Sequence, residues 1–247
     1  MANTDRFNKQ ILLKEIGHKG QEKITNSSVL IVGLGGIGSP LVRYLASSGV
    51  GNLCLIDDDI IELDNLPRQN NYKVSDIDSA KADVTAKLLK ELNPEIKLKI
   101  INKRANQKLL EALIVDYDLV IDASDNFQTK FLLGDICYRQ GKNYISGSFL
   151  GFKGYVAVYK SGIDDSLPCF RCFHPDDLDA STEKACYKQG VFSPGVGVVG
   201  TYMAAEALKE IAKIAQSSAG KMMIFDFLTN NHHMVKISRK TQCFCTK

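Results

Sequence analysis

The sequence lacks the features that mark a membrane, secreted or nucleic-acid-binding protein. No apolar run reaches the roughly 18 residues that a membrane-spanning helix needs. Residues 1–10 contain no apolar core of the kind found in a signal peptide. The 31 basic residues nearly balance the 28 acidic ones, and a net charge of +3 gives no reason to expect nucleic acid or a membrane surface as a partner. We therefore expect a cytoplasmic protein.

The chain also has no internal repeat, low-complexity tract or flexible linker. Its 247 residues, 45% of them apolar, allow one large α/β domain or two small ones. The seven cysteines are an odd number in a chain without a secretion signal. We therefore expect ligands, nucleophiles or buried thiols rather than disulfides. Cys54, in an apolar strand, and Cys137, in a predicted helix, are interpreted as packing residues.

Residues 29–59 are the stretch around which the chain is organised. An apolar strand over 29–32 is followed by a G-x-G-x-x-G turn at 33–38, a helix over 39–48 and a second apolar strand. Asp57 follows that second strand, 19 residues after the last glycine. Strand, glycine turn, helix and acid together predict a dinucleotide-type fingerprint, with phosphate at the helix N-terminus and ribose on the acid. The alternative is a tight turn without a ligand.

Strands and helices alternate through the first half of the chain and then stop alternating. This βαβαβαβ pattern predicts an α/β, Rossmann-like fold with a mostly parallel, doubly wound sheet. After residue 147 the pattern predicts an antiparallel extension. The further elements that we expect are helices over 5–24, 79–92, 107–115, 127–140 and 200–216, and strands over 97–101, 118–122, 143–146, 152–159, 222–227 and 234–237, with 152–159 half exposed.

Charged residues follow the second strand. Residues 57–59 are aspartates, and the predicted loop 64–72 carries Arg68, whose planar guanidinium suits phosphate. Lys81 lies near the start of the predicted helix 79–92, where a cation opposes the helix dipole unless an anion lies in front. For the loop with Arg68, the alternative is a solvated loop without a ligand. For Lys81, the alternative is an ordinary exposed lysine.

A third polar cluster follows the buried strand 118–122. Asp122, Asp125 and Asn126 lie at a carboxyl strand end, which is where ligands bind in open α/β sheets. Carboxylate and amide oxygens at such a place suit Mg²⁺. The alternative, which is compatible with the first interpretation, is that Asp125 or Asn126 caps the next helix.

Two close cysteine pairs predict a structural zinc ion. Cys169-x-x-Cys172 and Cys243-x-Cys245 together offer four thiolates, although the second pair has an unusual spacing. Unrelated thiols or a redox pair are the alternatives.

With these motifs the chain resembles the ThiF/MoeB/HesA family, the bacterial relatives of ubiquitin-activating enzymes. The resemblance extends over nearly the whole length, and its specificity lies in the combination of motifs. The matching segments are 6–10, 33–38, 57–59, 65–69, Lys81, 122–126, 169–172 and 190–200.

The resemblance implies a single domain over residues 1–247, with a nucleotide-binding half (1–147) and a carrier-binding and zinc half (148–247). It also implies ATP- and Mg²⁺-dependent adenylylation of the C-terminal glycine of a small ubiquitin-like sulfur carrier of the ThiS or MoaD type. Such carriers serve thiamine or molybdopterin biosynthesis.

The family's roles are carried over by matching position. Asp57 is expected to hold the ribose, Arg68 and Lys81 the phosphates, and Asp125 either Mg²⁺ or the attacking carboxylate. The other nucleotide-binding positions implied are Gly33, Gly35, Gly36, Gly38, Asp59, Asn65, Gln69, Asp122 and Asn126. Zinc is expected on Cys169, Cys172, Cys243 and Cys245, away from the chemistry.

Two further expectations concern residues at the family's variable positions. Lys9 stands where the family often has an arginine that reaches the partner subunit's ATP, which implies a homodimer. Cys186 stands where some relatives carry a cysteine that takes up the activated tail or its sulfur, from a donor such as a cysteine desulfurase. The alternative for Cys186 is an ordinary loop thiol.

Other functions are compatible with parts of the sequence. Within the same class, the substrate could be another peptide or ubiquitin-like C-terminus. The glycine pattern alone would permit an NAD-dependent oxidoreductase, but that function would leave Arg68, Lys81 and Asp125 without a role. A third alternative is a nucleotide-binding scaffold without catalysis, but such a scaffold would not require the complete set of site residues found in this sequence.

Overall fold

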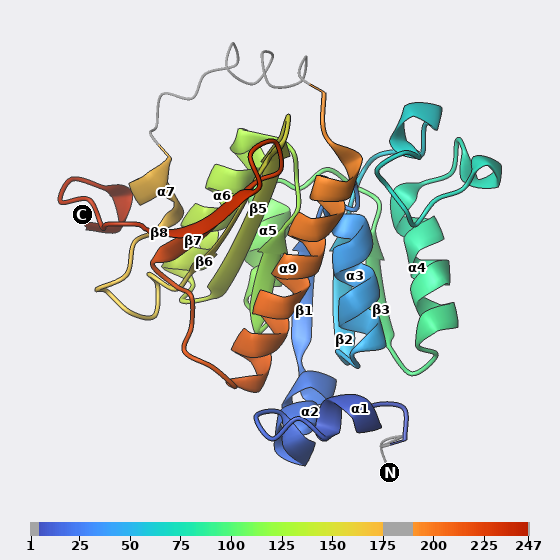
Figure 1. Cartoon of the computed structure of the whole chain (residues 1–247), viewed down its shortest axis with the longest axis horizontal. Coiled ribbons are helices and arrows are strands. Elements are labelled where there is room, and N and C mark those ends of the chain that lie inside the picture. The colour runs from blue at the N-terminus through green and yellow to red at the C-terminus, as the bar shows by residue number, and fades with distance from the viewer. Residues whose placement is uncertain (1–4, 175–189, 247) are drawn as a thin grey trace.

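The computed structural model describes residues 5–174 and 190–246. One eight-stranded sheet runs through the molecule in the order β3-β2-β1-β4-β5-β6-β7-β8 (Figure 1). The strands β3, β2, β1, β4 and β5 are parallel, and β6, β7 and β8 continue the sheet in antiparallel pairing. The strands are β1 (Ser28–Val32), β2 (Asn52–Ile56), β3 (Lys97–Ile101), β4 (Leu119–Asp122), β5 (Asn143–Leu150), β6 (Lys153–Tyr159), β7 (Lys221–Asp226) and β8 (Asn231–Lys236).

Helices cover both faces of the sheet, and those that lie between β1 and β5 in the sequence connect the parallel strands. They are α1 (Asn8–Ile11), α2 (Gly17–Asn26), α3 (Gly38–Ser47), α4 (Lys81–Leu92), α5 (Gln107–Ile114), α6 (Phe127–Arg139), α7 (Phe170–Phe173) and α9 (Ser193–Ala212). Short 3₁₀ turns lie at Leu63–Asn65, Val74–Asp76 and Phe244–Thr246. Within the described ranges, none of the helices is long and apolar enough to span a bilayer.

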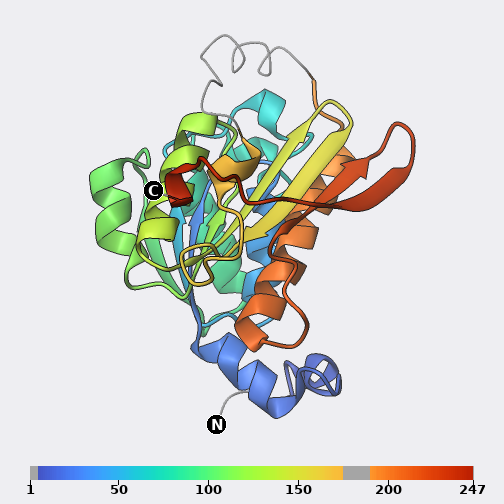
Figure 2. The same cartoon turned by 90° about the vertical axis from the view of Figure 1, so that its left-hand side faces the viewer.

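Helices lie on the two opposite faces of the sheet (Figure 2), and each face carries a hydrophobic core. On one face the apolar sides of α3, α4 and α9 pack against the strands, with Leu41 and Leu45 of α3 fully buried. On the other face α5, α6 and α7 do the same, with Leu110 and Leu133 fully buried. This arrangement confirms the predicted doubly wound fold with an antiparallel extension.

The strand order reverses at β1, and this reversal positions the functional residues. Strand β1 lies between β2 and β4, and Val32 at its end is level with Asp122 at the end of β4. Ligands in open α/β sheets bind at such a switch point, beyond the carboxyl ends of the strands. The glycine turn after β1 therefore lies beside the polar segment 122–126 after β4.

The structure differs from the predicted elements in three main respects. The helix expected over 5–24 is two helices, because the chain turns at residues 12–16 and Gly17 adopts a positive φ of 53°. Strand β6 is mostly buried rather than half exposed, since it lies between β5 and β7 and α9 packs on it. Helix α9 begins at Ser193, seven residues before the predicted start at 200, with Pro194 in its first turn.

Candidate active site

The glycine turn is packed so closely at Gly33 and Gly38 that side chains are excluded at these two positions. Gly33 has a φ of 95°, and a Cβ atom there would lie 2.6 Å from the Ala123 carbonyl oxygen. A Cβ atom on Gly38 would lie 2.2 Å from the Gly33 carbonyl oxygen. At Gly35, by contrast, the nearest atom to such a Cβ would be Gln69 Nε2 at 3.6 Å. The turn is thus held against the β4 loop, and Gly35 is its least crowded glycine among these three.

Asp57 is bound to the glycine turn by its own carboxylate. Its Oδ2 accepts a hydrogen bond from the Leu34 amide at 2.7 Å, and its Oδ1 accepts one from the Asp59 amide at 2.9 Å. Burial raises the pKa of Asp57, although these two backbone donors favour the ionised form. A carboxylate fixed beside the turn at the end of β2 is where an acceptor for ribose hydroxyls is required.

Lys81 is buried and paired. Its side chain is 6% exposed, and its Nζ lies 2.8 Å from Oδ2 of the exposed Asp59. The alternative interpretation of Lys81 as an ordinary exposed lysine is therefore wrong. The ion pair with Asp59 offsets the unfavourable position of a cation at the start of α4.

The segment with Arg68 and Gln69 lies against the glycine turn. A Cβ atom on Gly36 would lie 3.1 Å from the Arg68 carbonyl oxygen, and the Arg68 guanidinium donates to the Asp64 carbonyl at 2.6 Å. Asn65 is buried and serves the local fold, since its amide donates to the Asp64 carboxylate at 2.7 Å. Gln69 is 4% exposed, and its Oε1 has no hydrogen-bond partner among the residues that the structure describes. A buried polar atom without a partner beside the turn fits a bound polar ligand.

The residues after β4 are held in different ways. Asp122 is fully buried, and its carboxylate accepts hydrogen bonds from Ser124, Lys130, Tyr144 and Ser146. Asn126 caps α6 by accepting from the Thr129 amide at 2.8 Å, which confirms that alternative. The carboxylate of Asp125 is exposed, so in this segment it is the acid that is accessible to a ligand. Asp122 is instead fully engaged within the protein.

Lys130 is the polar residue of this region that sequence reasoning missed. It lies in the first turns of α6 and is 4% exposed. The signal was present, because Lys130 shares the apolar i, i+3, i+4, i+7 spacing with Leu133, Gly134 and Cys137. A lysine in such a stripe needs a buried partner.

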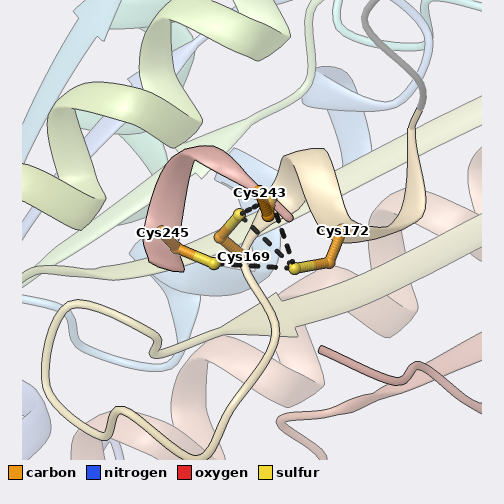
Figure 3. A group of neighbouring side chains, drawn as sticks. All are labelled: Cys169, Cys172, Cys243 and Cys245. Atoms are coloured by element: carbon orange, nitrogen blue, oxygen red, sulfur yellow. Dashed lines mark hydrogen bonds between the residues drawn. The ribbon is translucent and has the colours of Figure 1, made fainter. Parts of the chain in front are cut away.

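The four predicted zinc ligands come together from distant parts of the chain (Figure 3). The sulfur atoms of Cys169, Cys172, Cys243 and Cys245 lie within 4.8 Å of one another, with closest pairs at 3.5–3.7 Å. All four are buried. Tetrahedral thiolates bound at about 2.3 Å to zinc lie about 3.8 Å apart, so this cluster fits a zinc ion.

Two predicted residues lie away from the glycine turn or outside the description. Lys9 is exposed on α1, beside the C-terminal end of α3, where the Gln10 side chain donates to the Ser48 carbonyl at 3.2 Å. The glycine turn is at the opposite end of α3 (Figure 1). Cys186 falls outside the described residues.

The reversed strand order, the glycine turn and the acid at the end of β2 define a Rossmann-like nucleotide-binding protein. The sequence model of the ThiF family matches residues 7–245, and the chain belongs to this family. It is 35% identical over 241 residues to the sulfur carrier protein adenylyltransferase of Thermus thermophilus, with 97% of this chain and 89% of that protein covered. It is 37% identical to the sulfur carrier protein ThiS adenylyltransferase of Escherichia coli, with 96% and 93% covered.

The comparisons extend to an archaeal enzyme and to solved structures. The SAMP-activating enzyme E1 of Haloferax volcanii is 32% identical, with 97% of this chain and 87% of that protein covered. The crystal structure of E. coli MccB with ATP is 25% identical with a TM-score of 0.82, covering 93% of this chain and 68% of that one. Another MccB structure, with MccA-N7isoASN, gives a TM-score of 0.87 at 24% identity, covering 100% and 76%, and supports the fold.

Proposed function

We propose that this protein uses ATP to adenylylate the C-terminal glycine of a small ubiquitin-like sulfur carrier, for thiamine or molybdopterin biosynthesis. The observation that carries the proposal is the arrangement of four charged residues around one glycine turn. Asp57 and Asp125 follow the carboxyl ends of β2 and β4, Arg68 lies in the connection before α4, and Lys81 is the first residue of α4. Identities of 35% and 37% to sulfur carrier adenylyltransferases, over nearly the whole chain, support the same reaction.

Each residue has a task that its surroundings allow. Asp57, fixed by the Leu34 amide, accepts hydrogen bonds from the ribose hydroxyls. Arg68 and Lys81 bind the phosphates, and Gln69 supplies a side-chain amide beside them. Asp125 holds Mg²⁺ or orients the attacking carboxylate. Mg²⁺, when bound, neutralises charge on the phosphate oxygens.

The chemistry itself needs little more than this placement. A carboxylate oxygen of the carrier tail forms a bond to the α-phosphorus of ATP, the bond from that phosphorus to the bridging oxygen breaks, and pyrophosphate leaves. The tail carboxylate is already ionised at neutral pH, so no general base is required. Clustered cations stabilise the charge that moves onto pyrophosphate.

The carrier's globular body is expected to bind an aromatic surface next to the glycine turn. We use this term for Phe149, Phe152, Phe192, Phe227 and His232, whose rings are linked by contacts of 5.2–6.1 Å between centroids. Phe152 and Phe192 are 43% and 39% exposed and stack on each other, so their exposed apolar area is contiguous.

The aromatic surface is continuous with the glycine turn through α9. Phe192 precedes the first residue of α9, and Val196, one turn further on, would lie 2.6 Å from a Cβ atom on Gly36. A carrier bound to the aromatic surface therefore lies beside the turn that its tail must reach. We accordingly assign nucleotide binding to residues 1–147 and carrier binding, with zinc, to residues 148–247.

Three further features complete the proposal. The four-cysteine cluster holds a structural Zn²⁺ ion. The protein works as a homodimer in which Lys9 serves the partner subunit. Cys186 accepts the activated tail or its sulfur, with a cysteine desulfurase as the donor.

The test is ATP–pyrophosphate exchange with a small carrier that ends in Gly-Gly. Exchange should require both the carrier and Mg²⁺, and Asp125→Ala should abolish it while circular dichroism shows a folded protein. Asp116→Ala, another exposed acid at the far end of the sheet, is the matched control and should retain activity. Wild-type exchange in Asp125→Ala would remove Asp125 from the reaction. Thermal stabilisation by NAD rather than ATP would favour the oxidoreductase instead.

A further inference from the structure

Lys130 on α6 is a buried cation that no step of the proposed reaction uses. Its Nζ donates to Asp122 Oδ2 at 3.1 Å and to the Gly147 carbonyl at 2.9 Å, and its side chain is 5% exposed. Replacing a buried ion pair by apolar residues of similar volume is often neutral or stabilising. Stability of the fold alone therefore does not account for a lysine at this position.

The partner of Lys130 is saturated with hydrogen bonds. Asp122 Oδ1 accepts from the Ser124 amide at 2.9 Å and from its hydroxyl at 2.5 Å. Asp122 Oδ2 accepts from Lys130, from the Tyr144 hydroxyl at 2.8 Å and from the Ser146 hydroxyl at 3.1 Å. This carboxylate is thus fixed by groups from α6 and β5, and it fixes Ser124 in return.

These contacts hold a short segment from both ends and leave its middle exposed. Segment 122–126 is held at its start by Lys130 through Asp122, and at its end by Asn126, which caps the same helix. Between these points Asp125 is exposed to solvent. The segment also contacts the glycine turn, since the Ala123 carbonyl lies against Gly33. A displacement at Lys130 would therefore move Asp125 relative to the turn.

We propose that Lys130 is a positioning residue for adenylylation, which acts through Asp122 to fix Asp125 beside the glycine turn. This inference rests on the proposed function and adds to it a residue that touches neither ATP nor the carrier tail. A catalytic group displaced by about 1 Å can cost on the order of a hundredfold in rate. The effect is expected in kcat, because ribose and phosphate are held by Asp57, Arg68 and Lys81.

Four variants separate positioning from stability. Lys130→Met removes the cation at similar length, and Lys130→Arg keeps it, with a small cavity beside Lys130, Ser146 and Ser148 providing room for the guanidinium. Lys130→Met with Asp122→Asn removes both charges and avoids a buried carboxylate without a cation. Lys142→Met is the matched control, because the Lys142 ammonium also donates to two groups, the Val115 and Tyr117 carbonyls, far from Asp125.

Carrier-dependent exchange should respond in kcat. We expect Lys130→Met to lower kcat about a hundredfold while KM for ATP stays within about threefold, and Lys130→Arg to stay within about tenfold of wild type. The Lys130→Met/Asp122→Asn variant should regain thermal stability and keep the low kcat. Lys142→Met should lose stability and keep its kcat.

Either of two kinetic results would overturn the inference. One is a wild-type kcat in folded Lys130→Met, and the other is recovery of kcat together with stability in the double variant. Absence of carrier-dependent exchange in the wild type would instead refute the proposed function. The placement is then tested by amide hydrogen exchange, which should be faster at residues 123–125 in Lys130→Met than in Lys142→Met and the wild type. Equal amide hydrogen exchange at residues 123–125 in Lys130→Met and the wild type would refute the inference on its own.

Discussion

The ammonium of Lys81 lies 2.8 Å from the Asp59 carboxylate, and the lysine side chain is 6% exposed whereas the aspartate is 65% exposed. The cation is thus fixed by the fold, while its partner remains open to solvent and to ligands. A phosphate oxygen that reaches this point meets an ammonium that is already oriented. Little side-chain entropy is then lost when the phosphate binds.

This pair leads to the first prediction, which concerns ATP affinity. A charge-assisted hydrogen bond contributes about 1.5–3 kcal/mol, so Lys81→Met should raise KM for ATP about 10–100-fold. Lys87→Met, on the exposed side of the same helix, is the control and should leave KM unchanged. A folded Lys81→Met protein with a wild-type KM would show that Lys81 does not bind phosphate.

The second prediction concerns pH and Asp57. Because burial raises the pKa of the Asp57 carboxyl above its ordinary 3.8, Asp57 becomes protonated at a higher pH than an exposed aspartate does as the pH is lowered. The protonated form loses acceptor capacity toward the ribose, so KM for ATP should rise as the pH is lowered from about 8 to about 4.5.

Asp57→Asn separates this effect from acid unfolding. The variant should have a raised KM at neutral pH and a flatter dependence on pH, because its amide does not titrate in this range. An equally steep rise in KM for Asp57→Asn would assign the titration to another group. Circular dichroism at each pH establishes that the protein remains folded.

The third prediction is that the purified protein contains one Zn²⁺ ion per chain, held by the four-cysteine cluster. The ion ties Cys169 to Cys243, which are distant in sequence, so its loss should lower stability rather than catalytic rate. We expect Cys243→Ser with Cys245→Ser to lose the metal and to melt at least about 5 °C lower. Cys54→Ala, at a buried cysteine outside the cluster, should retain zinc. Full zinc occupancy in the double serine variant would exclude the Cys243–Cys245 pair.

The fourth prediction tests the aromatic surface. Phe152 stacks on Phe192 at 5.3 Å between ring centroids and is 43% exposed. Removal of an exposed aromatic anchor costs about 1–2 kcal/mol in a typical interface, so Phe152→Ala should raise KM for the carrier about tenfold and leave KM for ATP unchanged. Val115→Ala, at an exposed valine at the end of α5, is the control. Equal carrier KM values in the two variants would place the carrier elsewhere.

Local patterns in the sequence were sufficient for much of the fold. The run from β1 through the glycine turn and α3 to β2 has periodicities that depend on neighbours a few residues away, and all four elements form as predicted. The burial of β6 was not predictable in this way, because it depends on β5, β7 and α9. The break before Gly17 was also missed, since the flanking apolar residues fit one helix as well as two.

The candidate site shows the same division. Each site residue was found from its own motif, yet the pairing of Lys81 with Asp59, 22 positions apart, and of Lys130 with Asp122 comes from the tertiary structure. Asp122 illustrates the consequence. Its motif indicates a ligand-binding acid, but three of the five hydrogen bonds that occupy its carboxylate come from Lys130, Tyr144 and Ser146 and depend on where α6 and β5 pack.

The last prediction concerns Lys9 and the proposed homodimer. Helix α1 is held at the C-terminal end of α3, because Gln10 donates to the Ser48 carbonyl and Phe7 packs where Gly49 leaves space. The glycine turn lies at the other end of α3, which is about 15 Å long. Lys9 is exposed on α1. Because α1 and the glycine turn lie at opposite ends of α3, Lys9 lies too far from the ATP-binding site of its own subunit.

In the proposed homodimer, we expect two-fold symmetry to bring each Lys9 to the other subunit's phosphates. Its neighbour Arg6 is already used within the chain, since it donates to the Leu92 carbonyl at the end of α4. We expect Lys9→Ala to lower turnover more than ATP affinity, with the dimer intact. Lys14→Ala, at an exposed lysine between α1 and α2, should behave like the wild type.

Complementation decides whether Lys9 acts on the partner. Lys9→Ala alone is expected to turn over too slowly to be detected in this assay, and Asp125→Ala is expected to be inactive. A mixed dimer contains one site that combines an intact Asp125 with an intact Lys9 from the partner, and one site that lacks both. Random exchange of equal amounts makes half of the dimers mixed, so activity should return to about a quarter of the wild-type value. If exchange is demonstrated by labelled subunits and activity stays at zero, Lys9 does not serve the partner subunit.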